Sequence, residues 1–179
     1  MKMQETAQQY TQRILSNVDG REALTVQQAT PARLKKLIRG LSAKQLKWKP
    51  EPGKWSIAEI LAHLADAEIA GSWRMRLIVG ASGTEVHPFD QDAWAAAFQY
   101  AKRDARNSVE VFRVLRENNL AMLKALRPED WDKFGMHLER GKETIAHMTR
   151  MFAGHDTNHV RQIEGIVSQL TSRPKRTRK

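Results

Sequence analysis

Apolar residues recur every three or four positions along most of the chain, which is the spacing of helices that bury one face. Glycine and proline interrupt these stretches at few places, so the pattern predicts an all-α domain. We expect four long helices packed as a four-helix bundle, with short additional helices at the N-terminus and in the connections. The long helices are expected over 22–38, 57–79, 105–126 and 142–170, and the short ones over 4–15, one turn after Ser42, and 91–97.

The starts of the helices differ in how clearly they are marked. Ser56 and Glu59 fit a capping box, in which each side chain bonds to the backbone of the other residue. Asp90 or Asp92 can cap the short helix that follows. Thr30 and Pro31 allow two interpretations: they are the N-cap and first-turn proline of a new helix, or they lie inside a helix that began near Glu22. Both interpretations stay open at this point.

The length of 179 residues suits one domain with one core. We divide the chain into an N-terminal helix (1–20), the four-helix bundle (21–171) and a basic tail (172–179). Hydrophobic residues make up 41% and charged residues 28% of the sequence, which is typical of a globular protein and excludes wholesale disorder. No apolar run is long enough to span a membrane, and the first residues lack an apolar signal core, so we expect a cytoplasmic protein without membrane contact.

The formal net charge of +10 raises the question of nucleic-acid binding. Half of that excess lies in the last seven residues, which include Arg173, Lys175, Arg176, Arg178 and Lys179 and contain no acid. A solvated terminus is the simpler interpretation of this tail, and a contact to nucleic acid is the alternative. The rest of the chain alternates acids and bases along the expected helices, which does not favour a nucleic-acid surface.

The last expected helix carries two histidines on its apolar face. Its face residues are spaced three and four apart, as in the seam of a helix that faces a bundle core: Ile145, Met148, Phe152, His155, His159, Gln162 and Ile166. His155 and His159 lie one turn apart, so both imidazoles can point at one ion. Asp156 stands where the His-Glu-x-x-His motif of zinc proteases needs a glutamate, which disfavours a protease.

A third histidine, His63, lies in the second long helix with the small residues Ala67 and Ala70 beyond it. If this helix faces the last one, three neutral imidazoles can bind a divalent transition metal and leave a position open, as catalytic zinc sites do. The alternative is that all three are hydrogen-bonded core histidines. The sequence has no cysteine, which removes disulfides, thiolate metal sites and cysteine nucleophiles.

Taken together, these residues resemble the DinB-like (DNA-damage-inducible, YfiT-like) family of bacterial four-helix-bundle metalloproteins. The resemblance covers about residues 30–170. It depends on the order of four segments, with one histidine in the second bundle helix and a pair in the fourth: Pro52–Leu64, Phe89–Trp94, His137–Gly141 and Ala153–Ile163.

The resemblance implies a divalent metal, usually zinc or nickel, held by His63, His155 and His159. It also implies a homodimer, a small-molecule substrate and, by analogy with better understood relatives, thiol S-transfer with a low-molecular-weight thiol as cofactor. A metal-dependent hydrolase is the alternative, since a bound metal can also activate water. Two non-catalytic hypotheses remain: a stress-response or nucleic-acid-associated module that uses the basic tail, and a helical interaction domain whose histidines only fill the core.

Two further residues are weaker catalytic candidates. Asp66 lies three residues after His63 and can orient its ring or act as a base, or it can be a solvated carboxylate. Arg140 can hold an anionic part of a substrate or pair with Glu139 at the surface.

Other residues are assigned minor roles. Trp55 and Trp94 are expected to pack loops against the bundle rather than to wall a pocket. Asn118 and Asn119 interrupt the third long helix and can support the site from behind. Three more histidines, His87, His137 and His147, are expected at the surface or facing a substrate.

Overall fold

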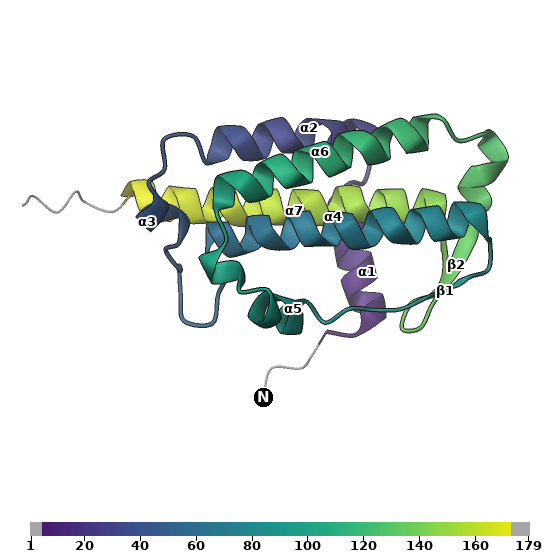
Figure 1. The fold of residues 1–179 in the computed structure, drawn as a ribbon, viewed down its shortest axis with the longest axis horizontal. Coiled ribbons are helices and arrows are strands. Elements are labelled where there is room, and N and C mark those ends of the chain that lie inside the picture. The colour runs from purple at the N-terminus through teal and green to yellow at the C-terminus, as the bar shows by residue number, and fades with distance from the viewer. Residues whose placement is uncertain (1–4, 173–179) are drawn as a thin grey trace, which may run out of the picture.

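Four long helices run along one axis in the computed structural model, which describes residues 5–172 (Figure 1). They are α2 (Ala23–Leu37), α4 (Ile57–Gly80), α6 (Ala105–Lys124) and α7 (Ile145–Ser172). Helices α2 and α7 run in one direction and α4 and α6 in the other. Helix α2 packs against α6 and α7, and α4 packs against the same two helices, so the expected four-helix bundle is confirmed.

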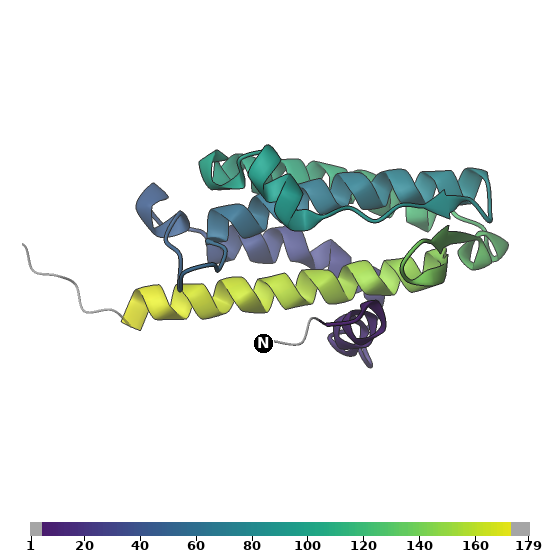
Figure 2. The ribbon, with the colours of Figure 1, turned by 90° about the horizontal axis from the view of Figure 1, so that it is seen from below.

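The parallel course of α4 and α6 requires a long return connection between them, because the chain leaves α4 at the opposite end of the bundle from the start of α6. Residues 81–104 make this return along the outside of the bundle (Figure 2). They contain strand β1 (Glu85–Val86), helix α5 (Gln91–Ala97) and a 3₁₀ turn at Tyr100–Lys102.

Capping side chains fix several helix starts, as the sequence predicted. Ser56 and Glu59 form the expected capping box of α4, and Asp90 caps α5 by accepting from the backbone N–H groups of Asp92 and Ala93. Capping boxes also begin α1 (Ala7–Ser16), at Thr6, and the single turn α3 (Ala43–Leu46), at Ser42. Each box satisfies backbone donors that a helix end leaves unpaired.

Helix α2 settles the question of Pro31. The helix begins at Ala23, with Glu22 as its N-cap, and continues through Pro31. A proline inside a helix leaves the carbonyl four residues earlier without its usual donor. Here that carbonyl is Gln27 O, and Arg116 Nη1 from α6 donates to it at 3.4 Å. The helix therefore tolerates the proline because a neighbouring helix supplies the missing donor.

A small sheet precedes α7, where the sequence had predicted only helix and turns. Strands β2 (Phe134–His137) and β3 (Gly141–Thr144) form an antiparallel hairpin, and β1 adds to β2 in parallel. The prediction of helix from residue 142 was therefore wrong for residues 142–144. Gly141, with a positive φ of 75°, makes the hairpin turn, a conformation that glycine adopts without steric cost.

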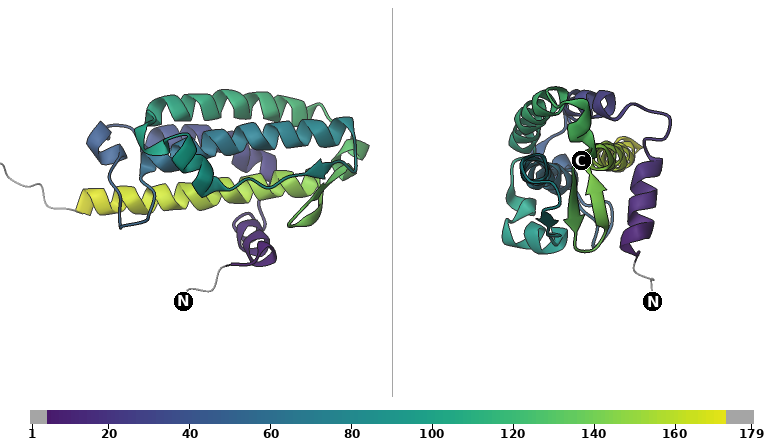
Figure 3. Two further views of the ribbon diagram at one scale, coloured as in Figure 1. Left: turned by 60° about the horizontal axis from the view of Figure 1, so that its bottom comes forward. Right: turned by 90° about the vertical axis from the view of Figure 1, so that its right-hand side faces the viewer.

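Helix α1 lies across the bundle axis against α7 (Figures 2 and 3). A Cβ atom at Gly154 of α7 would lie 2.1 Å from the backbone oxygen of Ile14, so the two helices touch where α7 has no side chain. Ile14 is completely buried by this contact.

Two further expectations concern membrane-spanning helices and the basic tail. No helix within residues 5–172 is long and apolar enough to cross a membrane. The predicted basic tail lies outside the described residues from 173 onward, apart from Ser172, the last residue of α7.

Candidate metal centre

His63 from α4 and His155 and His159 from α7 meet at one point inside the bundle. The Nε2 atom of His155 lies 3.0 Å from that of His63 and 3.2 Å from that of His159. One nitrogen from each ring lies within 4.8 Å of the other two. The sequence predicted this convergence on the condition that the helix of His63 faces the last helix, and the structure places the three rings together.

The protein environment keeps the three imidazoles neutral. Burial lowers the pKa of His63 to about 3 and that of His159 to about 4, with His159 also opposing a charge on His63 and Gln162 partly offsetting the shift at His159. The pKa of His155 is lowered well below the usual value of 6.5 by the same burial and by the two neighbouring rings. Neutral imidazole is the form that coordinates metal ions.

The orientation of the rings also suits a metal ion. His159 Nδ1 lies 2.9 Å from the amide oxygen of Gln162, which can only accept, so the proton of His159 is on Nδ1 and the Nε2 lone pair faces the other rings. The indole of Trp55 packs against the His63 ring, with 5.1 Å between centroids. His63 Nδ1 is buried and has no hydrogen-bond partner within residues 5–172. Three imidazole nitrogens gathered in this way are a donor set for a divalent transition metal.

The seam predicted for α7 is only partly its core face. Ile145, Met148 and Ile166 are buried, but Gln162 is exposed and His155 is half-buried. The middle of the core face instead passes through Ala153, Asp156, Val160 and Ile163. His155 is half-buried because its side of α7 faces a cavity rather than another helix.

Asp156, between the two histidines, belongs to a buried ionic cluster with Arg116 of α6 and Glu68 of α4. The Arg116 guanidinium donates to both carboxylates, and the three side chains are at most 3% exposed. Asn119 donates to Glu68 at 2.6 Å. This cluster links α4, α6 and α7 directly behind the histidines, so it fixes how these helices meet.

Asp66, the weaker catalytic candidate on α4, binds Arg103 rather than the ring of His63. It is 6% exposed, so it is not a solvated carboxylate, and its Oδ1 accepts from Arg103 Nη1 at 2.7 Å. The nearby Tyr100 has its pKa raised by burial and by this carboxylate. Asp66 therefore connects α4 to the return connection next to the histidine cluster, and its described hydrogen bond does not go to His63.

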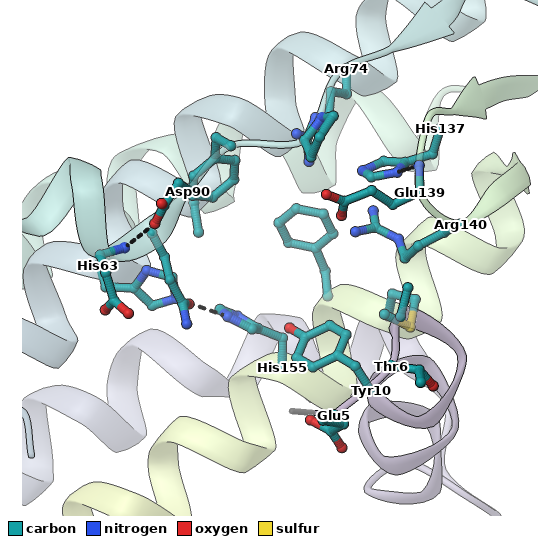
Figure 4. A pocket seen from close by; sticks show the side chains of 18 residues that line it. Glu5, Thr6, Tyr10, His63, Arg74, Asp90, His137, Glu139, Arg140 and His155 are labelled. Atoms are coloured by element: carbon teal, nitrogen blue, oxygen red, sulfur yellow. Dashed lines mark hydrogen bonds between the residues drawn. The ribbon is translucent and has the colours of Figure 1, made fainter. Parts of the chain in front are cut away.

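A cavity of about 800 Å³ extends from the histidines along the outside of α4 and α7 (Figure 4). His63 and His155 form one end of its wall, and Ala67, Met151 and Phe152 continue it. The remaining walls come from three segments that are distant in sequence: residues 5–10 of the N-terminal region, 88–92 of the return connection, and 137–140 of the hairpin. This volume is in the range of small-molecule sites.

Arg140, the second weaker candidate, lies in the wall of this cavity, as does Glu139. Its ion partner is Glu143, at 2.7 and 2.9 Å, so the pairing with Glu139 that the sequence allowed is not the one formed. His137, next to it, is 2% exposed and lines the cavity, so it does not lie at the surface, and of the two expectations for it only a position facing a substrate remains. Its burial depends on strand β2, which the sequence pattern did not reveal.

The other candidates divide between packing and surface positions. Trp94 stacks on Phe89 with 4.4 Å between centroids, as expected for a tryptophan that packs a loop. Asn119 is buried beside Glu68 whereas Asn118 is exposed, so only one of the pair supports the site from behind. His87 is exposed, and His147 is half-buried near Glu143.

The sequence analysis did not single out Arg74, which lies in the cavity wall. Its position on α4 resembles that of an ordinary surface residue, so no sequence pattern marked it.

Comparison with known proteins identifies the family. The DinB superfamily model matches residues 27–163, about three quarters of the chain, and the protein belongs to this superfamily. The matched region contains all three histidines, α4 and α6 in full and most of α2 and α7, whereas helix α1 precedes it.

Individual relatives agree with this assignment. A protein of Oceanobacillus iheyensis, named "Putative metal-dependent hydrolase", is 24% identical over 136 residues, which are 76% of this chain and 78% of the relative. A Bacillus cereus protein of the same name is 24% identical over 140 residues, covering 78% and 80% of the two chains. The structure of YfiT from Bacillus subtilis, described as a probable metal-dependent hydrolase with an unusual four-helix bundle topology, superposes with a TM-score of 0.78 at 18% identity and covers 96% of this chain and 93% of YfiT.

Proposed function

We propose that His63, His155 and His159 together bind one divalent transition-metal ion, and that the protein is a metal-dependent hydrolase of small molecules. The observation that carries the proposal is the meeting of three neutral imidazoles at one end of a cavity. The names of the relatives support the same activity. Zinc and nickel both suit a site of three imidazole nitrogens.

The chain's own residues prepare such a site in three ways. Gln162 holds His159 in the tautomer that offers Nε2, and Trp55 restrains the ring of His63. Phe152, Met151 and Ala67 give the cavity an apolar wall that removes water from around a substrate. When bound, a divalent ion supplies Lewis acidity, which polarises a substrate and activates water or a thiol.

The overall reaction of a hydrolase consumes one water molecule. The water oxygen bonds to the electrophilic atom of the substrate, the bond to the leaving group breaks, and the leaving group takes a proton from the water. The cavity volume of about 800 Å³ also favours a second candidate, because it leaves room for a small thiol beside the substrate. In that reaction a thiol sulfur takes the place of the water oxygen, and the thiol must be a separate molecule because the chain has no cysteine.

Metal content tests the first step of this proposal. We expect the protein purified without chelator to hold about one zinc or nickel ion per chain, since three imidazoles make one site. His155→Ala should abolish this binding, because it removes the ring that lies closest to both others. His147→Ala is the matched control and should keep its metal, because His147 lies two turns before His155 on the same helix, near Glu143, and is not one of the three clustered histidines. Mass spectrometry of the metals, with circular dichroism to confirm helical content, gives the answer, and a wild-type protein that takes up neither metal contradicts the proposal.

Activity distinguishes the two reactions. The metal-loaded protein should release the leaving group from activated esters or amides in buffer alone if it is a hydrolase. A thiol transferase should be inactive in buffer and active with a small thiol, and the product should carry the thiol sulfur. Product mass measured in ¹⁸O-labelled water separates the two outcomes, because only hydrolysis incorporates the label.

A further inference from the structure

The end of the cavity away from the metal ligands is lined by positive and hydrogen-bond-donating groups from two elements. Arg74 comes from α4, and His137 and Arg140 come from the β2–β3 hairpin. Figure 4 shows these three side chains together with Glu139 on one side of the cavity and His63 and His155 on the other. The proposed hydrolase function does not use this end.

His137 holds an unused hydrogen-bond donor there. The backbone N–H of Glu139 donates to His137 Nδ1 at 3.2 Å, so Nδ1 is the acceptor of the ring and Nε2 carries the proton. Burial, together with Arg140 and Arg74, lowers the pKa of His137 to about 4, so the ring is neutral at pH 7 and this tautomer persists. His137 Nε2 is buried and has no partner within residues 5–172. A buried donor without an acceptor is unfavourable, and an oxygen of a ligand would satisfy it.

Two guanidinium groups and two carboxylates meet at this end, but among the described residues only Arg140 forms an ion pair, and Arg74 does not. Glu143 is buried and pairs with Arg140 through two hydrogen bonds. Glu139 is exposed, so water screens its charge. The described hydrogen bond of Arg74 goes to the backbone oxygen of His87, and burial and the nearby Arg140 lower its pKa despite the two glutamates. An anion would therefore be stabilised beside Arg74.

We propose that Arg74, His137 and Arg140 form a binding site for an oxyanion, a carboxylate or a phosphate, on the substrate. Guanidinium groups recognise both anions through paired N–H donors, and the imidazole N–H adds a third direction. The substrate is then a small acid whose scissile bond lies toward the histidines and whose anionic group lies toward the hairpin. That the anion belongs to a substrate rests on the proposed function, whereas oxyanion binding does not.

Anion titration of the full-length protein tests this site. Inorganic phosphate and acetate are titrated separately by isothermal calorimetry into protein treated with chelator, so that no metal can bind the anion. We expect saturable binding of at least one of them, and the tighter one identifies the preferred oxyanion. Arg74→Met and His137→Phe should each weaken it by about tenfold, as expected for the loss of one hydrogen bond to a charged group. Arg140 is left unchanged because its removal would strand the buried Glu143.

The control variant is Arg76→Met, two residues after Arg74 on the same helix, whose guanidinium instead bonds to Asn118 and Asn119. It should bind the anions as the wild type does. The absence of anion binding in the wild type overturns the site. Equal binding by the wild type and all three variants also overturns it, because that result indicates only non-specific attraction of anions to a basic chain. The outcome is independent of the metal test: if metal binds but anions do not, the hydrolase proposal stands without an acidic substrate. If anions bind but metal does not, the oxyanion site stands alone.

Discussion

At the scale of single residues, His155 and His159 lie one turn apart on α7, whereas Asp66 and Asp156 bind arginines that are distant in sequence. His155 and His159 could be recognised because a four-residue spacing on an apolar face places both rings on one side of a helix. The partner of Asp66 could not be predicted, because Arg103 is distant in sequence and reaches it only through the course of the return connection. For the same reason, the sequence did not reveal that Asp156 pairs with Arg116. It showed only that residue 156 is not the glutamate of the zinc-protease motif.

Arg116 should be among the residues that matter most for stability. It is 1% exposed and neutralises the buried carboxylates of Glu68 and Asp156. Arg116→Met keeps the length of the side chain but leaves two buried acids without a cation, which typically costs about 3–5 kcal/mol of unfolding free energy. Urea unfolding followed by circular dichroism measures this loss.

The control for that measurement is Arg113→Met on the same helix. Arg113 pairs with Glu110 and Glu117 at the surface, where a salt bridge contributes about 0–1 kcal/mol. If both variants lose the same small amount, the cluster around Arg116 does not hold the helices together as inferred.

At the scale of elements, helices were predictable and strands were not. Capping boxes and long apolar periodicity mark a helix locally, so the starts of α4 and α6 and the existence of α5 followed from the sequence. Strands β2 and β3 have four residues each, too short for an alternating pattern to stand out. β2 also pairs with β1, which lies about fifty residues earlier, and a pairing over that separation leaves no local pattern in the sequence.

The docking of α1 on α7 depends on the absence of a side chain at Gly154. In Gly154→Ala the new Cβ would collide with the Ile14 backbone, which cannot move without displacing α1. We expect a loss of about 1–3 kcal/mol, as for other overpacked sites, and faster hydrogen exchange or tryptic cleavage within residues 7–16.

Gly165→Ala is the matched control, because it lies on the same helix with no neighbouring atom within 4 Å of the added Cβ. Alanine is the better helix former, so this variant should be equally stable or more stable by up to about 1 kcal/mol. Unchanged exchange of α1 in Gly154→Ala would show that the contact does not hold the helix.

At the scale of the whole molecule, buried neutral histidines make stability depend on pH. The pKa values of His63, His137 and His159 are about 3, 4 and 4 in the folded protein, against 6.5 for an ordinary histidine. As pH falls below about 6.5 the unfolded chain binds protons that the folded protein does not, so the free energy of unfolding decreases toward pH 4.

Urea unfolding of metal-free protein between pH 7.5 and 4.5 should show this decrease, with little change above about pH 7 from these groups. His137→Phe lies outside the proposed metal site and should reduce the slope. If the free energy of unfolding does not change from pH 7 to 4.5, the histidines take up protons in the folded protein as readily as in the unfolded chain, and their pKa values are not lowered.

Three predictions about the whole chain await other measurements. The homodimer can be checked by light scattering. Deletion of residues 173–179 tests whether salt-sensitive DNA binding exists and depends on the tail. Cell fractionation tests the cytoplasmic location.

The composition of the cavity wall affects how the substrate range of this protein can be changed. The histidines lie on two bundle helices, whereas much of what a substrate would touch comes from the N-terminal helix, the return connection and the hairpin. If the proposed function is correct, substrate selectivity and reactivity therefore depend on separate parts of the polypeptide. Randomising the three wall segments while leaving α4 and α7 untouched should diversify the accepted compounds without dismantling the chemical centre.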